Sequence, residues 1–186
     1  MKIVLASTSL RRKELLKKAG IGFVIEEPVC DENNDKHKDP RKKVESLSFL
    51  KAVSVFKNNR DAIVIGADTV VVIDGKILGK PKDIAEAKEM LRLLSGRTHT
   101  VITGITVMTK DKTFTESVLS KVKFKKLNEE EIEDYVKGHG VLDKAGAYAI
   151  QDGKTVESFK GSYTNIVGLP MERTEEILKE LGYGRG

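Results

Sequence analysis

The sequence is poor in the side chains that build disulfides, thiolate metal sites and aromatic binding platforms. Among its 186 residues it has one cysteine, no tryptophan and 5% aromatic residues. A single thiol excludes an intrachain disulfide and leaves no plausible cysteine-based zinc site. The histidines, His37, His99 and His139, lie too far apart to follow a metal-binding spacing. We therefore interpret Cys30 as a small apolar residue or an inert surface thiol, and each histidine as a structural or surface residue.

Long apolar runs are also absent. No run approaches the ~20 residues that span a bilayer, and the apolar run at residues 3–6 is shorter than the about 7–15 residues of a signal peptide core. Apolar residues make up 39% of the chain and charged residues 33%, which excludes a disordered protein. We expect a cytoplasmic protein without membrane contact, folded as one domain over residues 1–186.

Charge is unevenly distributed near the start of the chain. The net charge is only +5, but the stretch 2–18 has six basic residues and one acid, and the stretch 26–39 has six acids and two lysines. Neighbouring basic and acidic stretches suit a phosphate with its metal ion. Two solvated surfaces would give the same pattern, and charge alone favours that interpretation.

Hydrophobic periodicity and turn residues predict alternating strands and helices. Strands are predicted near residues 2–6, 23–26, 62–67 with an extended continuation over 69–73, 76–78, 98–109, 113–125, 148–151 and 156–160. Helices are predicted near 10–19 after an N-cap at Ser9, 40–57 after Asp39, 83–94, 128–137 and from Pro170 to about Leu181. Because hairpins are frequent, the pattern indicates an α/β fold with a mixed sheet.

The common phosphate-binding loops do not match. The stretch 75–81 has three residues between its glycines where a P-loop has four, and Pro81 replaces the hydroxyl residue that holds magnesium. Gly20 and Gly22 lack the third glycine of a dinucleotide-binding turn. These mismatches disfavour P-loop and Rossmann functions.

Arg11 and Arg12 follow a hydroxyl-rich turn at the start of the first predicted helix. Cations at a helix N-terminus oppose the helix dipole and cost a few tenths of a kcal/mol each, about 0.3–1 at most. A bound polyphosphate would offset that cost, since helix N-termini attract anions. A basic surface helix is the alternative.

Asp68 follows the apolar run 63–67, which places a carboxylate at the predicted end of a strand. Such a group can bind a metal ion or accept a proton from water, although turn-forming aspartates occupy similar positions. Lys80 lies on a short loop shortly after it, and Asp143 and Lys144 begin a third charged loop.

Together these stretches resemble the Maf family of nucleoside triphosphate pyrophosphatases. The matching segments are 5–16 (LASTSLRRKELL), 66–71 (GADTVV), 79–81 (GKP), 94–99 (LSGRTH), 143–151 (DKAGAYAIQ), 161–163 (GSY) and 167–170 (VGLP). They occur in the family's order and cover nearly the whole chain. One departure is Leu10, where the family usually has a proline; its loss should loosen the start of the helix rather than remove chemistry.

The resemblance implies a fold, an activity and partners. It implies a mixed central sheet flanked by helices, like that of inosine-triphosphate pyrophosphatases, with two lobes around a cleft. It implies hydrolysis of a nucleoside triphosphate to the monophosphate and pyrophosphate, with a divalent cation (Mg, Mn or Co) and a homodimer.

The resemblance also implies roles for individual residues. Asp68 would accept the proton of water and share the metal with Glu32. The phosphates would be held by Ser7, Arg11, Arg12, Lys80 and Lys144, and Lys51 matches a further family lysine. Arg11, Thr69 and Gln151 match positions tied to substrate choice.

The segment 143–151 resembles the branch that acts on dTTP and UTP. The Gln151 amide offers a donor and an acceptor, which match the N3–H and carbonyl edge of uracil or thymine. Pseudo-UTP and 5-methyl-UTP keep that edge, so a house-cleaning role on modified pyrimidine nucleotides is expected.

Two other classes of function remain open. A nucleotide-binding regulator of division would bind without turnover, but a pure anion site gains nothing from Asp68. A nucleic-acid binder could use the basic helix, but the low aromatic content and the missing motifs disfavour it.

Overall fold

The centre of the fold is a mixed β-sheet, seen in a computed structural model that describes residues 1–32 and 35–184. Within those residues the strands are β1 (Ile3–Ala6), β2 (Val24–Ile25), β3 (Ile63–Ile73), β4 (Lys76–Leu78), β5 (Thr98–Met108), β6 (Thr113–Phe124) and β7 (Val156–Lys160). The helices are α1 (Leu10–Lys18), α2 (Pro40–Phe56), α3 (Ile84–Leu94), α4 (Glu129–Gly138), α5 (Tyr163–Val167) and α6 (Met171–Glu180).

The strand order is β2-β1-β3-β5-β6-β7, and β4 pairs with β3 outside this path. β1 is parallel to β2 and β3, because helical crossovers connect these strands. The remaining pairs are antiparallel. The turn between β3 and β4 has positive φ at Asp74 and Gly75, as a tight hairpin requires. The predicted mixed α/β sheet is therefore confirmed.

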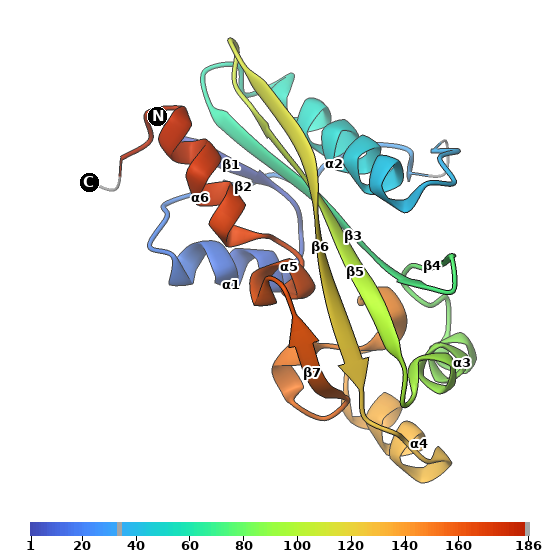
Figure 1. The fold of residues 1–186 in the computed structure, drawn as a ribbon. Coiled ribbons are helices and arrows are strands. Elements are labelled where there is room, and N and C mark those ends of the chain that lie inside the picture. Colours follow the sequence, from blue (N-terminus) through green and yellow to red (C-terminus); the bar gives the residue numbers. More distant parts are fainter. Residues whose placement is uncertain (33–34, 185–186) are drawn as a thin grey trace.

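Helices cover both faces of the upper part of the sheet (Figure 1). On one face Leu5 packs in a cluster with Leu16 of α1 and Ile177 of α6. On the other face Val4 packs with Val55 of α2. Consecutive residues of β1 thus serve opposite layers, which explains why this strand has no polar residue.

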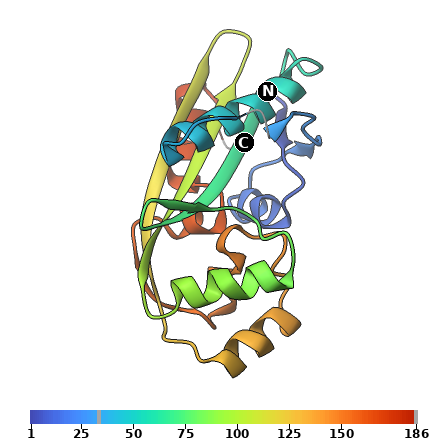
Figure 2. The ribbon, with the colours of Figure 1, turned by 90° about the vertical axis from the view of Figure 1, so that its right-hand side faces the viewer.

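A second lobe forms around the lower ends of β5 and β6, where α3 and α4 pack side by side (Figure 2). Its core contains Leu91 of α3, Ile132 of α4 and Phe124 of β6. The long β5–β6 hairpin joins this lobe to the upper one. Within the described residues no helix is long and apolar enough to cross a bilayer.

The predicted helix starts are confirmed at three positions, one of which is Asp83, whose side chain accepts a hydrogen bond from Glu86 N. The Asp39 side chain accepts a hydrogen bond from Lys42 N, and Asn128 forms a full capping box with Glu131. Ser9 occupies the N-cap position of α1, but its side chain makes no capping bond. Its backbone N–H instead donates to Ser7 Oγ at 3.2 Å.

Two predictions about elements are wrong. No strand forms over 148–151 within the described residues: Tyr148 and Ala149 have extended φ and ψ but join no strand, because 3-10 turns at Ala145–Ala147 and Ile150–Asp152 flank them. Asp68 does not end a strand, since β3 continues without a break from Ile63 to Ile73. Helix α5 was not predicted at all.

Candidate active site

A cavity of about 440 Å³ opens where β3 has no neighbour on one edge. The register with β1 ends at Ala6 and Gly66, and the register with β4 begins at Val71. Asp68 and Thr69 lie between these two pairings and line the cavity. A carboxylate in the middle of a buried strand therefore reaches an open space, because the strand is longer than its parallel neighbour.

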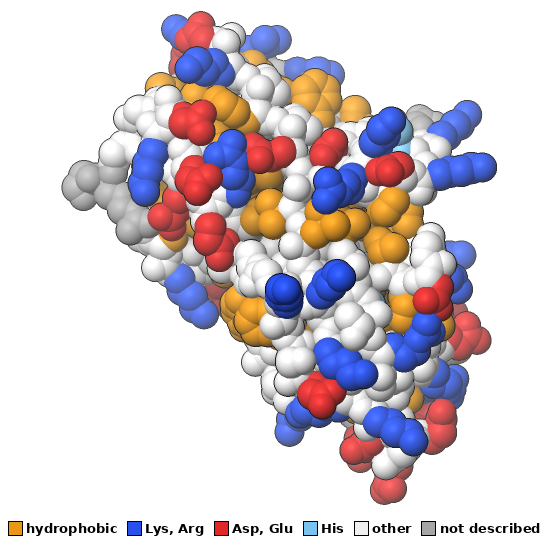
Figure 3. Space-filling view, viewed as in Figure 1, with side chains coloured by type: hydrophobic (Ala, Val, Ile, Leu, Met, Phe, Trp, Pro, Cys, Tyr) orange, Lys and Arg blue, Asp and Glu red, His pale blue; other side chains and the backbone are white. Residues whose placement is uncertain are grey.

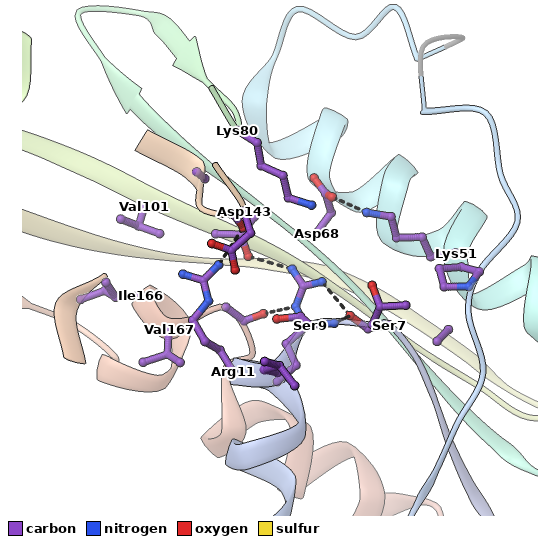
Figure 4. A pocket seen from close by; sticks show the side chains of 18 of the residues that line it. Ser7, Ser9, Arg11, Lys51, Asp68, Lys80, Val101, Asp143, Ile166 and Val167 are labelled. Atoms are coloured by element: carbon purple, nitrogen blue, oxygen red, sulfur yellow. Dashed lines mark hydrogen bonds and ion pairs between the residues drawn. The ribbon is translucent and has the colours of Figure 1, made fainter. Parts of the chain in front are cut away.

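Lys51 of α2 is held between two carboxylates. Its Nζ lies 2.6 Å from Asp68 Oδ1 and 3.0 Å from Glu32 Oε1. Lys51 and Asp68 are both buried, whereas the Glu32 side chain is about half exposed. Figure 4 shows Lys51 and Lys80 approaching Asp68 from different elements. The structure thus brings these four predicted site residues to one end of the cavity.

Arg12 is anchored on three sides. Its Nε donates to Gly168 O at 2.8 Å, and its two terminal nitrogens donate to Ser7 Oγ and to Thr69 Oγ1, each at 3.2 Å. Burial lowers the pKa of Arg12, and the charge of Asp68 opposes this shift. The guanidinium therefore has a fixed plane beside the Asp68 carboxylate.

Arg11 lies at the other end of the cavity, beside Val101, Ile166 and Val167 (Figure 4). Its Nη2 donates to Asp143 O at 3.2 Å. Among the described residues its buried Nε has no hydrogen-bond partner. Burial lowers the pKa of this arginine as well. An apolar wall beside an unpaired N–H donor suits a flat heterocycle that carries carbonyl oxygens.

Two predicted site residues do not line the cavity. Lys144 Nζ donates to Gly140 O and to Asp143 Oδ1, the latter at 2.6 Å, and its side chain folds back along its own loop. Gln151 is exposed in the second 3-10 turn. Asp143 and Tyr148 of the same segment do line the cavity. The roles of Lys144 and Gln151 stay predictions.

The structure adds residues that the sequence analysis did not single out. Gly168 O binds Arg12, and Thr103 and Asn165 form a buried network behind it. Tyr148 closes the apolar end and pairs its hydroxyl with His99 Nε2 at 2.8 Å. Threonine is common in β-strands, so a threonine in a Thr- and Val-rich strand does not indicate a functional residue. The sequence therefore contained no sign of the role of Thr103.

The face of the molecule in Figure 3 shows basic and acidic side chains interspersed over most of its area. A nucleic-acid interface is expected to have a continuous basic stripe. This face therefore offers no support for a nucleic-acid-binding function.

Comparison with known proteins gives consistent matches. The sequence model described as "Maf: Maf-like protein" matches residues 2–181. A dTTP/UTP pyrophosphatase of Clostridioides difficile (strain 630) is 48% identical over 184 residues, which are 97% of this chain and 95% of that protein. A dTTP/UTP pyrophosphatase of Bacillus cereus (strain AH820) is 48% identical over 181 residues, covering 96% and 95%.

Among solved structures, the Staphylococcus aureus Ham1 protein has a similar fold, with a TM-score of 0.59, 16% identity and coverage of 97% of this chain and 99% of that one. This likeness supports the inosine-triphosphate-pyrophosphatase-like fold that was predicted.

Proposed function

The chain belongs to the Maf-like protein family, and on that premise we propose that it hydrolyses dTTP and UTP to the monophosphate and pyrophosphate. The observation that carries this proposal is the buried Asp68 carboxylate facing a cavity with cations around it. Relatives that are 48% identical over almost the whole chain and carry this enzyme name support the same substrates.

The cations match the charge of the substrate. A nucleoside triphosphate carries about four negative charges, and the charge that develops on the leaving pyrophosphate needs further compensation. Arg12, Lys51 and Lys80 surround the Asp68 end of the cavity. The N-terminus of α1 adds backbone N–H groups and the positive end of the helix dipole. We therefore place the triphosphate at this end.

Asp68 accepts the proton of the attacking water. The water oxygen forms a bond to the α-phosphorus, the bond from the α-phosphorus to the bridging oxygen breaks, and pyrophosphate leaves with the electron pair. Lys51 donates to Oδ1 of Asp68, which holds the carboxylate in place. We assign the proton to the other oxygen, Oδ2.

A divalent cation (Mg, Mn or Co) fits the donor set. The Glu32 and Asp68 carboxylates lie close together, since each contacts the Lys51 ammonium through one oxygen, and their other oxygens would hold the ion. Within the described residues no group of three or more ligating side chains exists. Magnesium is commonly held by one or two carboxylates together with substrate phosphates, which is the arrangement available here. The bound ion would supply charge stabilisation for the phosphoryl oxygens.

The base is proposed to lie between Arg11 and the wall of Val101, Ile166 and Val167. The N–H groups of Arg11 suit the carbonyl oxygens of uracil and thymine. Gln151 would contribute its amide if the segment 150–152 moves toward the cavity. Modified pyrimidine nucleotides with the same edge are proposed as further substrates, which would make this a house-cleaning enzyme.

Two proposals rest on the family premise alone. We propose that two copies of the chain form a homodimer, which light scattering of the purified protein tests directly. We also propose that the enzyme works in the cytoplasm, where nucleoside triphosphates are made and used.

The deciding experiment is a screen of the common nucleoside triphosphates with Mg, Mn or Co, run with and without added inorganic pyrophosphatase. We expect phosphate only when pyrophosphatase is present, and most of it from dTTP and UTP. Phosphate without the coupling enzyme would mean cleavage of the terminal phosphate and would overturn the mechanism. Binding of nucleotide without any release would favour the regulator.

A further inference from the structure

A chain of hydroxyl groups connects Arg12 to the interior of the sheet. Arg12 Nη2 donates to Thr69 Oγ1 at 3.2 Å, and Thr69 Oγ1 lies 2.9 Å from Thr103 Oγ1. Thr103 in turn donates to Asn165 O at 2.9 Å. Thr103 is 0% exposed and does not line the cavity, so it cannot touch a nucleotide.

The donor and the acceptor of each hydrogen bond in this series of hydroxyl groups follow from the chemistry of the groups. A guanidinium can only donate and a carbonyl oxygen can only accept, and each threonine hydroxyl has one proton. Because Thr103 gives its proton to Asn165 O, Thr69 must give its own to Thr103. Thr69 Oγ1 then presents a lone pair to Arg12. Hydrogen bonds aligned in one direction strengthen one another.

The Asn165 end of this hydrogen-bonded series is anchored to the sheet by the Asn165 side chain of α5. Asn165 Nδ2 donates to Val101 O of β5 at 3.2 Å and to Ser120 Oγ of β6 at 3.0 Å. The C-cap residue of the same helix is Gly168, whose carbonyl accepts a hydrogen bond from Arg12 Nε at 2.8 Å. Two sides of the Arg12 guanidinium therefore depend on one short helix that is fixed to the sheet.

We propose that Thr103 is a positioning residue for the phosphate-binding Arg12, acting through Thr69; this inference rests on the proposed function. Arg12 uses three of its five N–H groups on Gly168, Ser7 and Thr69. These three bonds fix the guanidinium plane and leave the other two N–H groups for the phosphates. Without the Thr103 hydroxyl, the Thr69 proton loses its acceptor and Thr69 is free to rotate away from Arg12.

The test compares Thr103→Val with Thr103→Ser and with a matched control, Thr106→Val. Thr106 lies on the same strand and is also 0% exposed, but its hydroxyl pairs with Ser48 at 2.9 Å and Thr115 at 3.0 Å, neither of which contacts Arg12. The two valine variants remove the same group from equally buried sites. If Thr103 had only a structural role, the two valine variants would show the same changes in binding and in stability.

The measurements are KM and kcat for UTP in the coupled assay, the Kd of inorganic pyrophosphate by calorimetry, and the melting temperature. We expect Thr103→Val to raise KM and the pyrophosphate Kd about tenfold, the order expected for a weakened hydrogen bond to a charged group. We expect Thr103→Ser to restore both values, and Thr106→Val to lose stability with KM and Kd unchanged. Equal KM and Kd in the two valine variants, or no rescue by serine, would overturn the proposal.

A double variant tests the route through Thr69. If Thr103 acts only through Thr69, then Thr69→Val with Thr103→Val should bind pyrophosphate no more weakly than Thr69→Val alone. Additive losses would overturn this route. Failure of the proposed function looks different: the wild-type chain would release no pyrophosphate from any nucleotide, while the Kd series would still report on Arg12.

Discussion

At the scale of single residues, Asp68 combines burial, an ion pair and access to the cavity. Its Oδ1 is 2.6 Å from Lys51 Nζ, so the side chain is oriented before substrate arrives. A general base of this kind contributes about 10²–10⁴-fold to a rate. The neutral amide of asparagine keeps the shape and an acceptor for Lys51, but it cannot take a proton.

We therefore predict that Asp68→Asn lowers kcat for UTP by about 10²–10⁴-fold while nucleotide still binds. The coupled pyrophosphate assay gives kcat, and calorimetry with UTP gives Kd on the same preparation. A variant with a near-normal rate would remove Asp68 from the mechanism. A variant that neither binds nor folds would be uninformative about the proton, and its circular dichroism spectrum identifies that case.

His99 gives a prediction that concerns stability instead of turnover. Burial lowers the pKa of His99 from an ordinary 6.5 to about 4, in a cluster where the Tyr148 hydroxyl and the Phe124 ring surround it. Between these pH values the unfolded chain binds a proton that the folded chain does not. The free energy of unfolding therefore falls as the pH falls, by about 2 kcal/mol at pH 5 from this group.

Urea unfolding of the wild type and of His99→Gln at pH 7.5 and pH 5 measures this contribution. Glutamine does not titrate, so the stability advantage of the wild type should shrink by about 2 kcal/mol between the two conditions. A constant difference would mean that His99 has the same pKa in the folded and the unfolded chain.

Sequence motifs predicted the charged side chains of the site but not the buried residues that hold them in place. Arg11, Arg12 and Lys80 stand in segments whose residue types already point to phosphate chemistry. Thr103 and Asn165 belong to the site only because the hairpin and α5 bring them behind Thr69. No local sequence pattern predicts this placement, since the hydrogen-bond partners of these buried groups are distant in the sequence.

At the scale of elements, most caps and turns predicted from local chemistry are confirmed, although the Ser9 side chain makes no capping bond. Caps at Asp39 and Asn128 and the turn at Asp74 involve residues within four positions of one another, and all three formed. The strand predicted over 148–151 did not form because 3-10 turns at Ala145–Ala147 and Ile150–Asp152 flank it, the first with a positive φ at Ala147 that a non-glycine residue rarely adopts. Tertiary packing of Gly146 against Val71 overrides the local preference there.

Helix α2 packs closely against the sheet because Gly66 and Gly104 have no side chain. A Cβ on Gly104 would lie 2.2 Å from Val44 O and 2.8 Å from Glu45 N, and one on Gly66 would lie 2.4 Å from Ser48 O. The obstructing atoms are backbone atoms of α2, so a side chain there must displace the helix. That helix carries Lys51, which must reach Asp68.

We predict that Gly104→Ala lowers the free energy of unfolding by about 1–3 kcal/mol, the usual cost of overpacking, and also lowers kcat. Gly138→Ala is the control, because nothing lies within 4 Å of its added Cβ and alanine suits the end of α4. Urea unfolding and the coupled assay measure both effects. Equal stability of the two variants would show that α2 tolerates displacement.

At the scale of the whole molecule, the cavity draws residues from both lobes. Arg11 and Arg12 belong to α1 in the upper lobe, whereas Asp143 and Tyr148 belong to the lower one. A hydrogen bond from Arg11 Nη2 to Asp143 O crosses between the two lobes here. A nucleotide that contacts both sides would add further links across the cleft, so binding should stabilise the lobes together.

Hydrogen exchange with a UTP analogue that has a methylene group between the α- and β-phosphorus atoms tests this expectation on the intact chain. At 100 times its Kd the analogue adds about 2.7 kcal/mol to the free energy of unfolding. We predict slower exchange both in α1 and in the segment 143–148, with the β5–β6 turn at 110–112 as a distant reference for local effects. Protection confined to α1 would place the whole ligand on the upper lobe. The proposed contact of the base with Val101 and Ile166 in the lower lobe would then be wrong, even if the phosphates bind as proposed.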